Sequence, residues 1–388
     1  MGKKLSGCGE IGIICNLQFQ FGWAVVDGRK RVFKKAGLSL VLASGNERGD
    51  GYNLWLRADF MKIAVLSFTS GQIDRGAETV VKELSRRWQK QHQVKVYSSL
   101  SLGIKDLNKF NLQALKEADK FGAQIIMPIN GGRQSLLTRL YCRLKKKKMV
   151  VAGLAGLGWC DGWNLLMRPD VFVASLNRNT RWAKKFYGKG VRVEIIPHGV
   201  DLNKFKPEGK KRKLDLERPI ILCVAGPDQY KRVELTIRAT SKLEKGSLVL
   251  VGGSDEDEVL GEKLLGKRFK RLKAGYEELP EIYRAADVFT LVSESSEEFG
   301  IVYLEALASG LPVVATDDEL RREILGLYGI YVKDVFGKEY VDKLRLALRK
   351  RKGPTLPKEW LGKFDWDRIA KQYEALFSLL LGRNKVLV

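Results

Sequence analysis

The sequence contains little histidine and no paired-cysteine motif. Its 388 residues include two histidines, His92 and His198, and five cysteines. The number of cysteines is odd, and none stands in a C-x-x-C arrangement. These shortages exclude a histidine-rich metal centre and argue against a disulfide framework or a zinc site, so we predict a reduced, intracellular protein. No uninterrupted apolar run is long enough to span a bilayer.

Acidic side chains are scarce relative to basic ones. The chain has 45 Asp and Glu against 69 Lys and Arg, a formal net charge of +24. An excess of this size predicts an anionic partner, which is a membrane surface, a nucleic acid or a phosphorylated substrate. No nucleic-acid-binding module is recognisable, so we do not expect a specific nucleic-acid partner. The length suffices for two or three domains, and the 45% hydrophobic content supports buried cores.

Residues 287–316 have the pattern of strand, loop, helix and strand. An apolar run at 288–292 predicts a buried parallel strand, and a polar segment at 293–300 ends in glycine. Residues 301–308 have helical character with Gly310 as the stop, and 312–315 predict the next strand. Loops at the carboxyl ends of parallel strands bind ligands, and helix starts there suit phosphate.

Two carboxylates, Glu297 and Glu305, stand eight residues apart around this helix start. From spacing alone, two interpretations stay open. One is a helix-start charge followed by a surface glutamate, and the other is a pair of ligand-binding groups, since an acid on an apolar helix needs a partner.

The same stretch resembles the donor signature of family 4 retaining glycosyltransferases of the GT-B fold. That signature is E-x-F-G-[LI]-x-x-x-E-A-x-A-x-G-x-P-V-[VI]-A, and this chain matches it from Glu297 to Ala315. The resemblance implies an α/β protein of two Rossmann-like domains facing across a cleft, with a C-terminal helix that crosses back to the first domain. It also implies transfer of a sugar, of the hexosyl type, from a nucleotide-diphosphate donor to a glycan, lipid-linked or other acceptor, without metal or cofactor.

The resemblance assigns roles to named residues of the second domain. Glu297 would hold the sugar hydroxyls and Glu305 the ribose hydroxyls, with Phe299, Gly300 and Ile301 beside them. The string Tyr230 to Leu235 resembles the family's Y-K-R-V-[DE]-L, in which the lysine grips the diphosphate. This predicts Glu297 and Lys231 as the catalytic pair. Ala225 and Gly226 stand where many members carry an arginine, and the predicted substitute is Arg232 or another basic residue, with Gly226 also expected at the donor.

In the first domain, Gly76-Ala77-Glu78 resembles the family's G-G-A-E, with Arg75 in place of the first glycine. We therefore expect Gly76 to face the donor. A helix predicted over residues 134–147 has Leu136, Leu137, Leu140 and Leu144 on one side and basic residues elsewhere. Such a helix either packs with its charged face outward or lies on a membrane.

The chain departs from the family at three places. No histidine follows the strand at 149–152, so we predict acceptor or sugar contacts from Arg75, Asp161, Trp163 and Asn164. We expect Trp159 and Trp163 either to stack on a sugar ring or to be buried in the core. The family arginine is missing, and Glu319 and Leu320 replace two glycines. These departures keep open an alternative function, a nucleotide-sugar-binding protein that has lost catalysis. An epimerase on the same fold is a weaker option.

The predicted domain order is as follows: an extension at 1–60, a Rossmann-like acceptor domain at 61–206, a linker at 207–218, a donor domain at 219–364 and a crossing helix at 365–388. We expect Met61 to be the working start, while an anchor or partner segment at 1–60 is the alternative. We predict a cytoplasmic location, peripheral on the membrane face. The D-x-D at Asp255 and Asp257 is not expected to bind metal, since it follows a GT-B strand.

Overall fold

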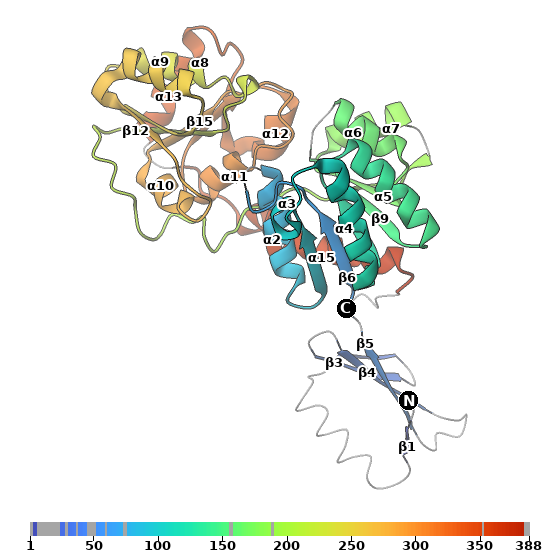
Figure 1. The fold of residues 1–388 in the computed structure, drawn as a ribbon. Coiled ribbons are helices and arrows are strands. Elements are labelled where there is room, and N and C mark those ends of the chain that lie inside the picture. Colours follow the sequence, from blue (N-terminus) through green and yellow to red (C-terminus); the bar gives the residue numbers. More distant parts are fainter. Residues whose placement is uncertain are drawn as a thin grey trace.

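The computed structural model describes residues 60–72, 76–154, 158–187, 190–350 and 353–383, together with five short strands before residue 60 (Figure 1). Those strands form an antiparallel sheet in the order β1-β5-β4-β3-β2. Their bounds are β1 Lys3–Leu5, β2 Ala24–Asp27, β3 Lys30–Lys35, β4 Leu38–Ser44 and β5 Tyr52–Ala58. The interpretation of residues 1–60 as an extension stays a prediction.

The first Rossmann-like domain is built on a six-stranded parallel sheet in the order β11-β10-β9-β8-β6-β7. The strands are β6 Lys62–Leu66, β7 Gln93–Tyr97, β8 Ile125–Pro128, β9 Lys148–Ala152, β10 Val171–Ala174 and β11 Val193–Ile195. The helices are α2 Gly76–Trp88, α3 Ser99–Leu102, α4 Leu107–Phe121, α5 Gly132–Leu144, α6 Trp159–Leu166 and α7 Asn177–Tyr187.

Alternate residues of β6 explain how the helices cover this sheet. Ile63 and Val65 join the core cluster that contains Leu84 of α2, while Ala64 and Leu66 join the cluster of α4. Side chains of a strand point alternately to the two faces, so both faces of the sheet are buried. Helix α2 lies on one face and α4 on the other.

The second domain repeats the plan with the parallel order β14-β13-β12-β15-β16-β17. Its strands are β12 Ile220–Ala225, β13 Ser247–Gly252, β14 Phe269–Leu272, β15 Val288–Leu291, β16 Val313–Thr316 and β17 Gly329–Val332. Its main helices are α8 Val233–Ser241, α9 Asp255–Leu265, α10 Leu279–Ala285, α11 Ile301–Ala308, α12 Glu319–Leu325 and α13 Lys338–Lys350. Short turns at Gln229–Lys231 (η2), Gly266–Arg268 (η3) and Gly326–Tyr328 (η4), and α14 (Lys358–Gly362), complete it.

The last helix, α15 (Trp366–Leu380), packs on α2 of the first domain. The indole of Trp88 donates to the carbonyl oxygen of Ala370 at 3.2 Å and stacks edge-on against the rings of Tyr373 and Phe377. Burial of three aromatic rings anchors the chain's end to its first domain. The predicted GT-B architecture, with its crossing helix, is confirmed. Among the residues that the structure describes, no helix is long and apolar enough to cross a membrane.

Candidate functional site

Lys231 and Glu297 meet where the strand order of the second domain reverses. Strand β12 continues to β13 on one side and has β15 on its other side, so the loops that follow β12 and β15 are neighbours. Lys231 follows β12 in the short turn η2, and Glu297 follows β15. A reversal of this kind is where open α/β sheets bind ligands. The sequence predicted both residues, and the structure brings them into contact.

The contact is a two-pronged ion pair. The Lys231 ammonium lies 2.6 Å from Oε1 and 2.7 Å from Oε2 of Glu297, and both side chains are largely buried. Burial opposes the charge on Lys231, but the Glu297 carboxylate outweighs it and raises the pKa of Lys231. Lys231 is therefore a permanent cation held at the carboxyl end of the sheet.

The signature loop, residues 293–300, is fixed from within its own domain by Arg321. This arginine is completely buried at the start of α12, next to Asp318. Its guanidinium donates to the backbone carbonyls of Ser293 and Glu294, both at 2.9 Å. A planar, always-charged group with several donors suits such a role. The loop that carries Glu297 is thus held in one conformation.

Arg178 of the first domain holds the same loop from the other side. It stands in α7, and its guanidinium donates to the carbonyl of Ser295 at 3.0 and 3.1 Å and to that of Glu297 at 2.9 Å. Burial lowers the pKa of Arg178, although Glu298 and other acids partly offset it. Sequence analysis missed Arg178 and Arg321, because each acts on a residue far away in the sequence. Arg178 donates to a carbonyl 117 positions away, and Arg321 donates to one 27 positions away.

Glu298 also bridges the two domains. Its Oε1 accepts from the Ser175 hydroxyl at 2.7 Å and from the Asn179 amide at 3.0 Å, both on the first domain. Its Oε2 is buried without a hydrogen-bond partner. Burial raises the pKa of Glu298 to about 8, and the negative charge of Asp161 on α6 adds to the effect. Glu298 therefore holds a proton near neutral pH.

Glu305 lies inside α11 with 3% of its surface exposed. Its Oε2 accepts a hydrogen bond from the Tyr283 hydroxyl at 2.9 Å. Burial raises the pKa of Glu305 to about 7, opposed by that hydrogen bond and assisted by the charge of Glu83. Glu305 is therefore not the surface glutamate that spacing alone allowed. Its predicted role at a ribose stays a prediction.

Other residues of the signature serve the fold. The side chains of Phe299 and Ile301 are buried in the core, and the Phe299 ring packs edge-on against His198 at 5.0 Å. That Phe299, Gly300 and Ile301 bind the donor stays a prediction. Gly300 has a φ of 81°, and a Cβ there would come within 2.5 Å of the Tyr303 ring. Only glycine fits this helix start.

The other residues predicted at the donor are Arg232, Gly226 and Gly76. Arg232 points to Glu294, with 3.2 Å between its Nη2 and Oε1, so it does not share the Glu297 carboxylate with Lys231. Gly226 follows β12, where a Cβ would lie 3.1 Å from Asp228 Oδ2. Gly76 begins α2 with open space around it. Arg75 lies outside the described residues.

On the first domain, α6 presents two different sides. Asp161 and Asn164 are buried and hydrogen-bonded to each other at 3.0 Å, and Asn164 also accepts from Ser135. Trp159 and Trp163 are exposed and pack edge-on against each other. The expectation that these tryptophans fill the core is wrong, and Trp163 does not share the inner side with Asp161.

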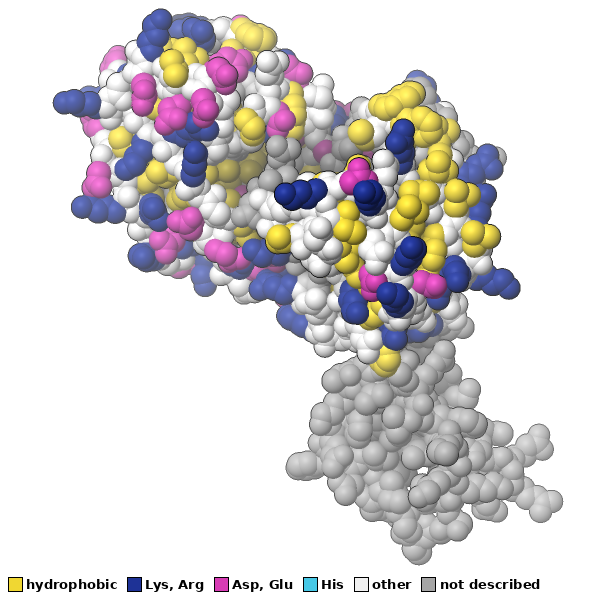
Figure 2. All heavy atoms as spheres, in the orientation of Figure 1, with side chains coloured by type: hydrophobic (Ala, Val, Ile, Leu, Met, Phe, Trp, Pro, Cys, Tyr) yellow, Lys and Arg dark blue, Asp and Glu magenta, His cyan; other side chains and the backbone are white. Residues whose placement is uncertain are grey.

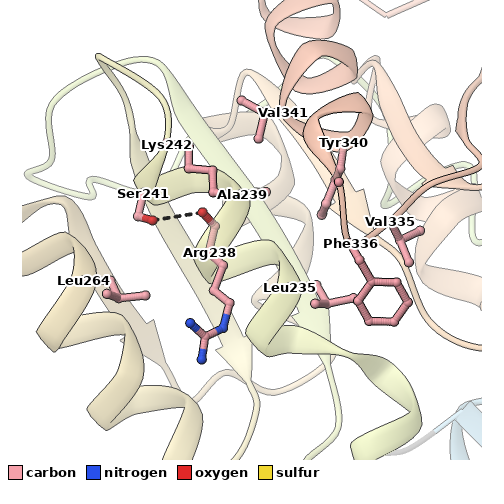
Figure 3. A pocket seen from close by; sticks show the side chains of 11 residues that line it. Leu235, Arg238, Ala239, Ser241, Lys242, Leu264, Val335, Phe336, Tyr340 and Val341 are labelled. Carbon is pink, nitrogen blue, oxygen red and sulfur yellow. Dashed lines mark hydrogen bonds between the residues drawn. The ribbon is translucent and has the colours of Figure 1, made fainter.

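Two further features lie apart from this site. Asp257 caps α9 together with Ser254, and Asp255 pairs with Arg271, which accounts for the D-x-D. Within the described ranges, no group of three His, Cys, Asp or Glu is placed to hold a metal ion. A pocket of about 230 Å³ between α8, α9 and α13, lined by Arg238, Lys242 and Phe336 among others, contains none of the predicted site residues (Figure 3).

Comparison with known proteins shows what the second domain is similar to. Residues 205–359 match the family model described as Glycosyl transferases group 1. Mannosylfructose-phosphate synthase of Agrobacterium fabrum is 34% identical over 154 residues, which is 34% of this chain and 34% of that protein. A GDP-mannose-dependent alpha-(1-6)-phosphatidylinositol monomannoside mannosyltransferase of Mycolicibacterium smegmatis is 34% identical over 166 residues, 37% of this chain and 43% of that protein. The chain thus spans less than half the length of these relatives.

The fold comparison covers more of the chain. The structure of sucrose-phosphate synthase from Thermosynechococcus elongatus has a TM-score of 0.66 at 20% identity, covering 84% of this chain and 100% of that one. At this identity the likeness concerns the fold, and it includes both Rossmann-like domains. Residues 205–359 are thus similar to the glycosyl transferases group 1 family, and the two domains have the GT-B fold.

Proposed function

We propose that the protein is a retaining glycosyltransferase that moves a hexosyl group from a nucleotide-diphosphate donor to an acceptor. The observation that carries this proposal is the buried pair of Lys231 and Glu297 at the strand-order reversal of the second domain. A fixed cation at that place suits a diphosphate, and a carboxylate beside it suits sugar hydroxyls. The relatives' printed names, which include a mannosyltransferase and a synthase of a sugar phosphate, agree with this class.

Donor binding separates Lys231 from Glu297 and gives each of them a role. The diphosphate takes the place of the Glu297 carboxylate on Lys231, and Glu297 is then free to accept hydrogen bonds from the sugar. As the bond between the anomeric carbon and the phosphate oxygen breaks, negative charge grows on the diphosphate. Lys231 stabilises that charge best in the transition state, which is how a preorganised cation accelerates a reaction.

The buried arginines reduce the cost of bringing an anion beside Glu297. Arg321 lies close enough to Glu297 that the carboxylate contributes to the raised pKa of Arg321. Arg178 holds the carbonyl of Glu297 from the first domain. Contact between the domains at this loop also excludes water, which would otherwise hydrolyse the donor.

Binding and turnover measured together test the proposal. The protein is screened by thermal shift against nucleotide sugars, because a bound ligand raises stability by mass action. The selected donor is then incubated with sugar and lipid-linked acceptors, and the anomeric configuration of the product is determined by NMR. Transfer with retention supports the proposal. Inverted product overturns it, and saturable binding without transfer or donor hydrolysis favours the binding protein that has lost catalysis.

We also propose that the protein works in the cytoplasm at the surface of a membrane, with a glycan or lipid-linked acceptor. The support is the net charge of +24, which attracts anionic lipid headgroups. The proposal assigns no specific nucleic-acid partner and no cofactor.

A further inference from the structure

Two neighbouring helices of the first domain expose large apolar side chains to solvent. Leu144 is 83% exposed and Trp159 is 79% exposed, and four further residues are exposed beside them. The α5–α6 face is defined here as Leu136, Leu140 and Leu144 of α5 with Trp159, Trp163 and Leu166 of α6. Contiguous apolar patches of this kind on a soluble domain mark interaction sites.

The internal packing of α5 shows that Leu136, Leu140 and Leu144 are not directed to the core, whereas Leu137 packs against it. The buried residues of this helix are Gln134, Ser135, Thr138 and Cys142. Ser135 donates to Asn164 of α6 at 2.5 Å, and Gln134 donates to Asn111 of α4 at 2.9 Å. The helix therefore packs through polar and small side chains and turns its leucine stripe outward. The expected packed helix with a charged outer face is therefore found, but three of its leucines, Leu136, Leu140 and Leu144, are exposed with the charges.

Cations surround this apolar surface. Arg133, Arg143, Lys145 and Lys146 are exposed on or next to α5. Asp119, the neighbouring acid on α4, already pairs with Lys145 and accepts from Tyr141. Figure 2 shows yellow apolar side chains interspersed with dark-blue cations over the first domain, on the side where Figure 1 places α4, α5 and α6.

We propose that the α5–α6 face docks the protein on an anionic lipid bilayer, with its leucines and tryptophans at the headgroup boundary and its cations on lipid phosphates. Tryptophan is enriched at that boundary because its ring is apolar with one polar group. Interfacial helices combine such residues with Lys and Arg.

The consequence of docking rests on the proposed function: a glycosyltransferase held on a bilayer by this face would use a lipid-linked acceptor. Helix α6 exposes Trp159 and Trp163 on one side, while Asp161 on its buried side acts electrostatically on Glu298 in the candidate site. In the docked protein, α6 therefore lies between the bilayer and the candidate site. A head group carried on a lipid reaches the site without leaving the membrane, which favours such an acceptor over a free glycan.

Vesicle co-sedimentation of the full chain tests the docking face. The vesicles are pure phosphatidylcholine or an equal mixture of phosphatidylcholine and phosphatidylglycerol. We expect the wild type to prefer the anionic vesicles by at least about ten-fold, with binding weakened by salt. Two double variants, Leu140→Ser with Leu144→Ser and Arg143→Glu with Lys146→Glu, should each lower binding by about ten-fold or more.

Matched controls come from exposed positions of the second domain. Val259→Ser with Leu327→Ser removes apolar side chains that are at least as exposed, and Lys242→Glu with Lys245→Glu changes the net charge by the same amount. Both controls should bind anionic vesicles within about two-fold of the wild type, since a change outside the docked face contributes little. In addition, the tryptophan emission should shift to the blue on anionic vesicles, and Trp159→Phe with Trp163→Phe should abolish most of that shift.

Several outcomes overturn the docking proposal. The first is equal binding to both vesicle types, and the second is an equal loss of vesicle binding in the variants and their controls. The third is a wild-type dimer, detected by sedimentation, that becomes a monomer in the Leu140→Ser and Leu144→Ser double variant. Nucleotide-sugar binding, measured by calorimetry on every variant, confirms that each is folded. It also separates the two proposals in the wild type: donor binding without a preference for anionic vesicles overturns the membrane face alone, and vesicle docking without donor binding overturns the glycosyltransferase.

Discussion

Lys231 and Glu297, 66 residues apart in sequence, neutralise each other in the protein without donor, with 2.6 and 2.7 Å between the ammonium and the two carboxylate oxygens. A buried pair of this kind is costly to break by removing one partner, since the other charge is left uncompensated. The same geometry prepares both groups for a ligand that carries a diphosphate next to a sugar. The pair therefore links the stability of the site to the presence of the donor.

Lys231→Ala should lower kcat about 10²–10³-fold while raising KM much less, because the contact strengthens as charge grows on the leaving diphosphate. Lys231→Arg should recover part of the rate, since the guanidinium keeps the charge but is planar and wider. Initial rates with the selected donor provide the measurement.

The control for this series is Lys242→Ala. Lys242 directly follows α8, and its replacement leaves the Lys231–Glu297 pair in place. Thermal unfolding accompanies the kinetics, because Lys231→Ala also leaves Glu297 unpaired and should destabilise the protein by about 3–5 kcal/mol. A folded Lys231→Ala variant with wild-type kcat and KM would remove Lys231 from the donor site. Arg232→Ala, measured in parallel, tests the substitute role of that arginine.

The sequence predicted the parts of this site that local patterns encode. The apolar run, the polar loop and the glycine at 310 located β15, the signature loop and α11, whose helix spans Ile301–Ala308 as expected. Periodicity, however, shows which side chains share a helix face and not which face is turned inward. For α5 the inward face is fixed by the polar groups it meets, Asn111 and Asn164 on other helices.

Motif resemblance likewise does not separate ligand contacts from packing. Phe299 matches the donor signature, yet its ring packs on His198 and Phe364. Contacts between residues distant in sequence leave no local pattern, so the sequence could not assign Arg178 of the first domain or Arg321 of the second to the signature loop. Only the assembled fold brings α7 of the first domain onto that loop.

Glu305→Ala should weaken donor affinity about 10–100-fold with the fold intact, since a charged acceptor to ribose hydroxyls is lost. Calorimetry with the nucleotide sugar and with the free nucleoside diphosphate gives the measurement, and both affinities should fall together. Tyr283→Phe is the matched control, because it removes the hydroxyl that bonds Glu305 but keeps the carboxylate. Donor affinity that is the same in Glu305→Ala and in the wild type would place Glu305 outside the site.

Arg178→Ala should lower kcat/KM at least about ten-fold, because misplacing a binding group by a fraction of an ångström is costly in rate. Arg178→Lys should rescue little, since one ammonium cannot reproduce a fork of donors to two carbonyls. Arg181→Ala is the control on the same helix. It also loses a contact across the domain interface, to Glu319, but that pair is exposed and should matter little. Equal effects of the two alanine substitutions would reject the positioning role of Arg178.

Transfer activity should be the same in EDTA and in added Mg²⁺ or Mn²⁺. Asp255 is paired with Arg271 at 2.8 Å and Asp257 caps its own helix, so neither carboxylate is directed at the candidate site. Activity is measured after exhaustive dialysis against chelator and again after each cation is restored. Loss with EDTA and recovery with one cation would return Asp255 and Asp257 to consideration as metal ligands.

The last prediction concerns the pH dependence of stability through Glu298. Burial raises the folded-state pKa of this carboxyl to about 8, whereas an unfolded glutamate titrates near its ordinary value of about 4.3. Between these values the folded protein binds more protons than the unfolded chain. The stability that Glu298 contributes is therefore fully present below the unfolded pKa and is lost as the pH rises toward 8.

Glu298→Gln isolates this contribution. The glutamine keeps an oxygen that can accept from Ser175 and Asn179, but it cannot ionise. The free energy of unfolding of the wild type should therefore fall relative to that of the variant as the pH rises from about 5 to 8, by up to about 1.4 kcal/mol per pH unit for one proton. Denaturant titrations of both proteins across this range provide the test. A difference between the two proteins that does not change with pH would show that Glu298 is ionised throughout, and that the bridge from Ser175 to the signature loop is made by a carboxylate.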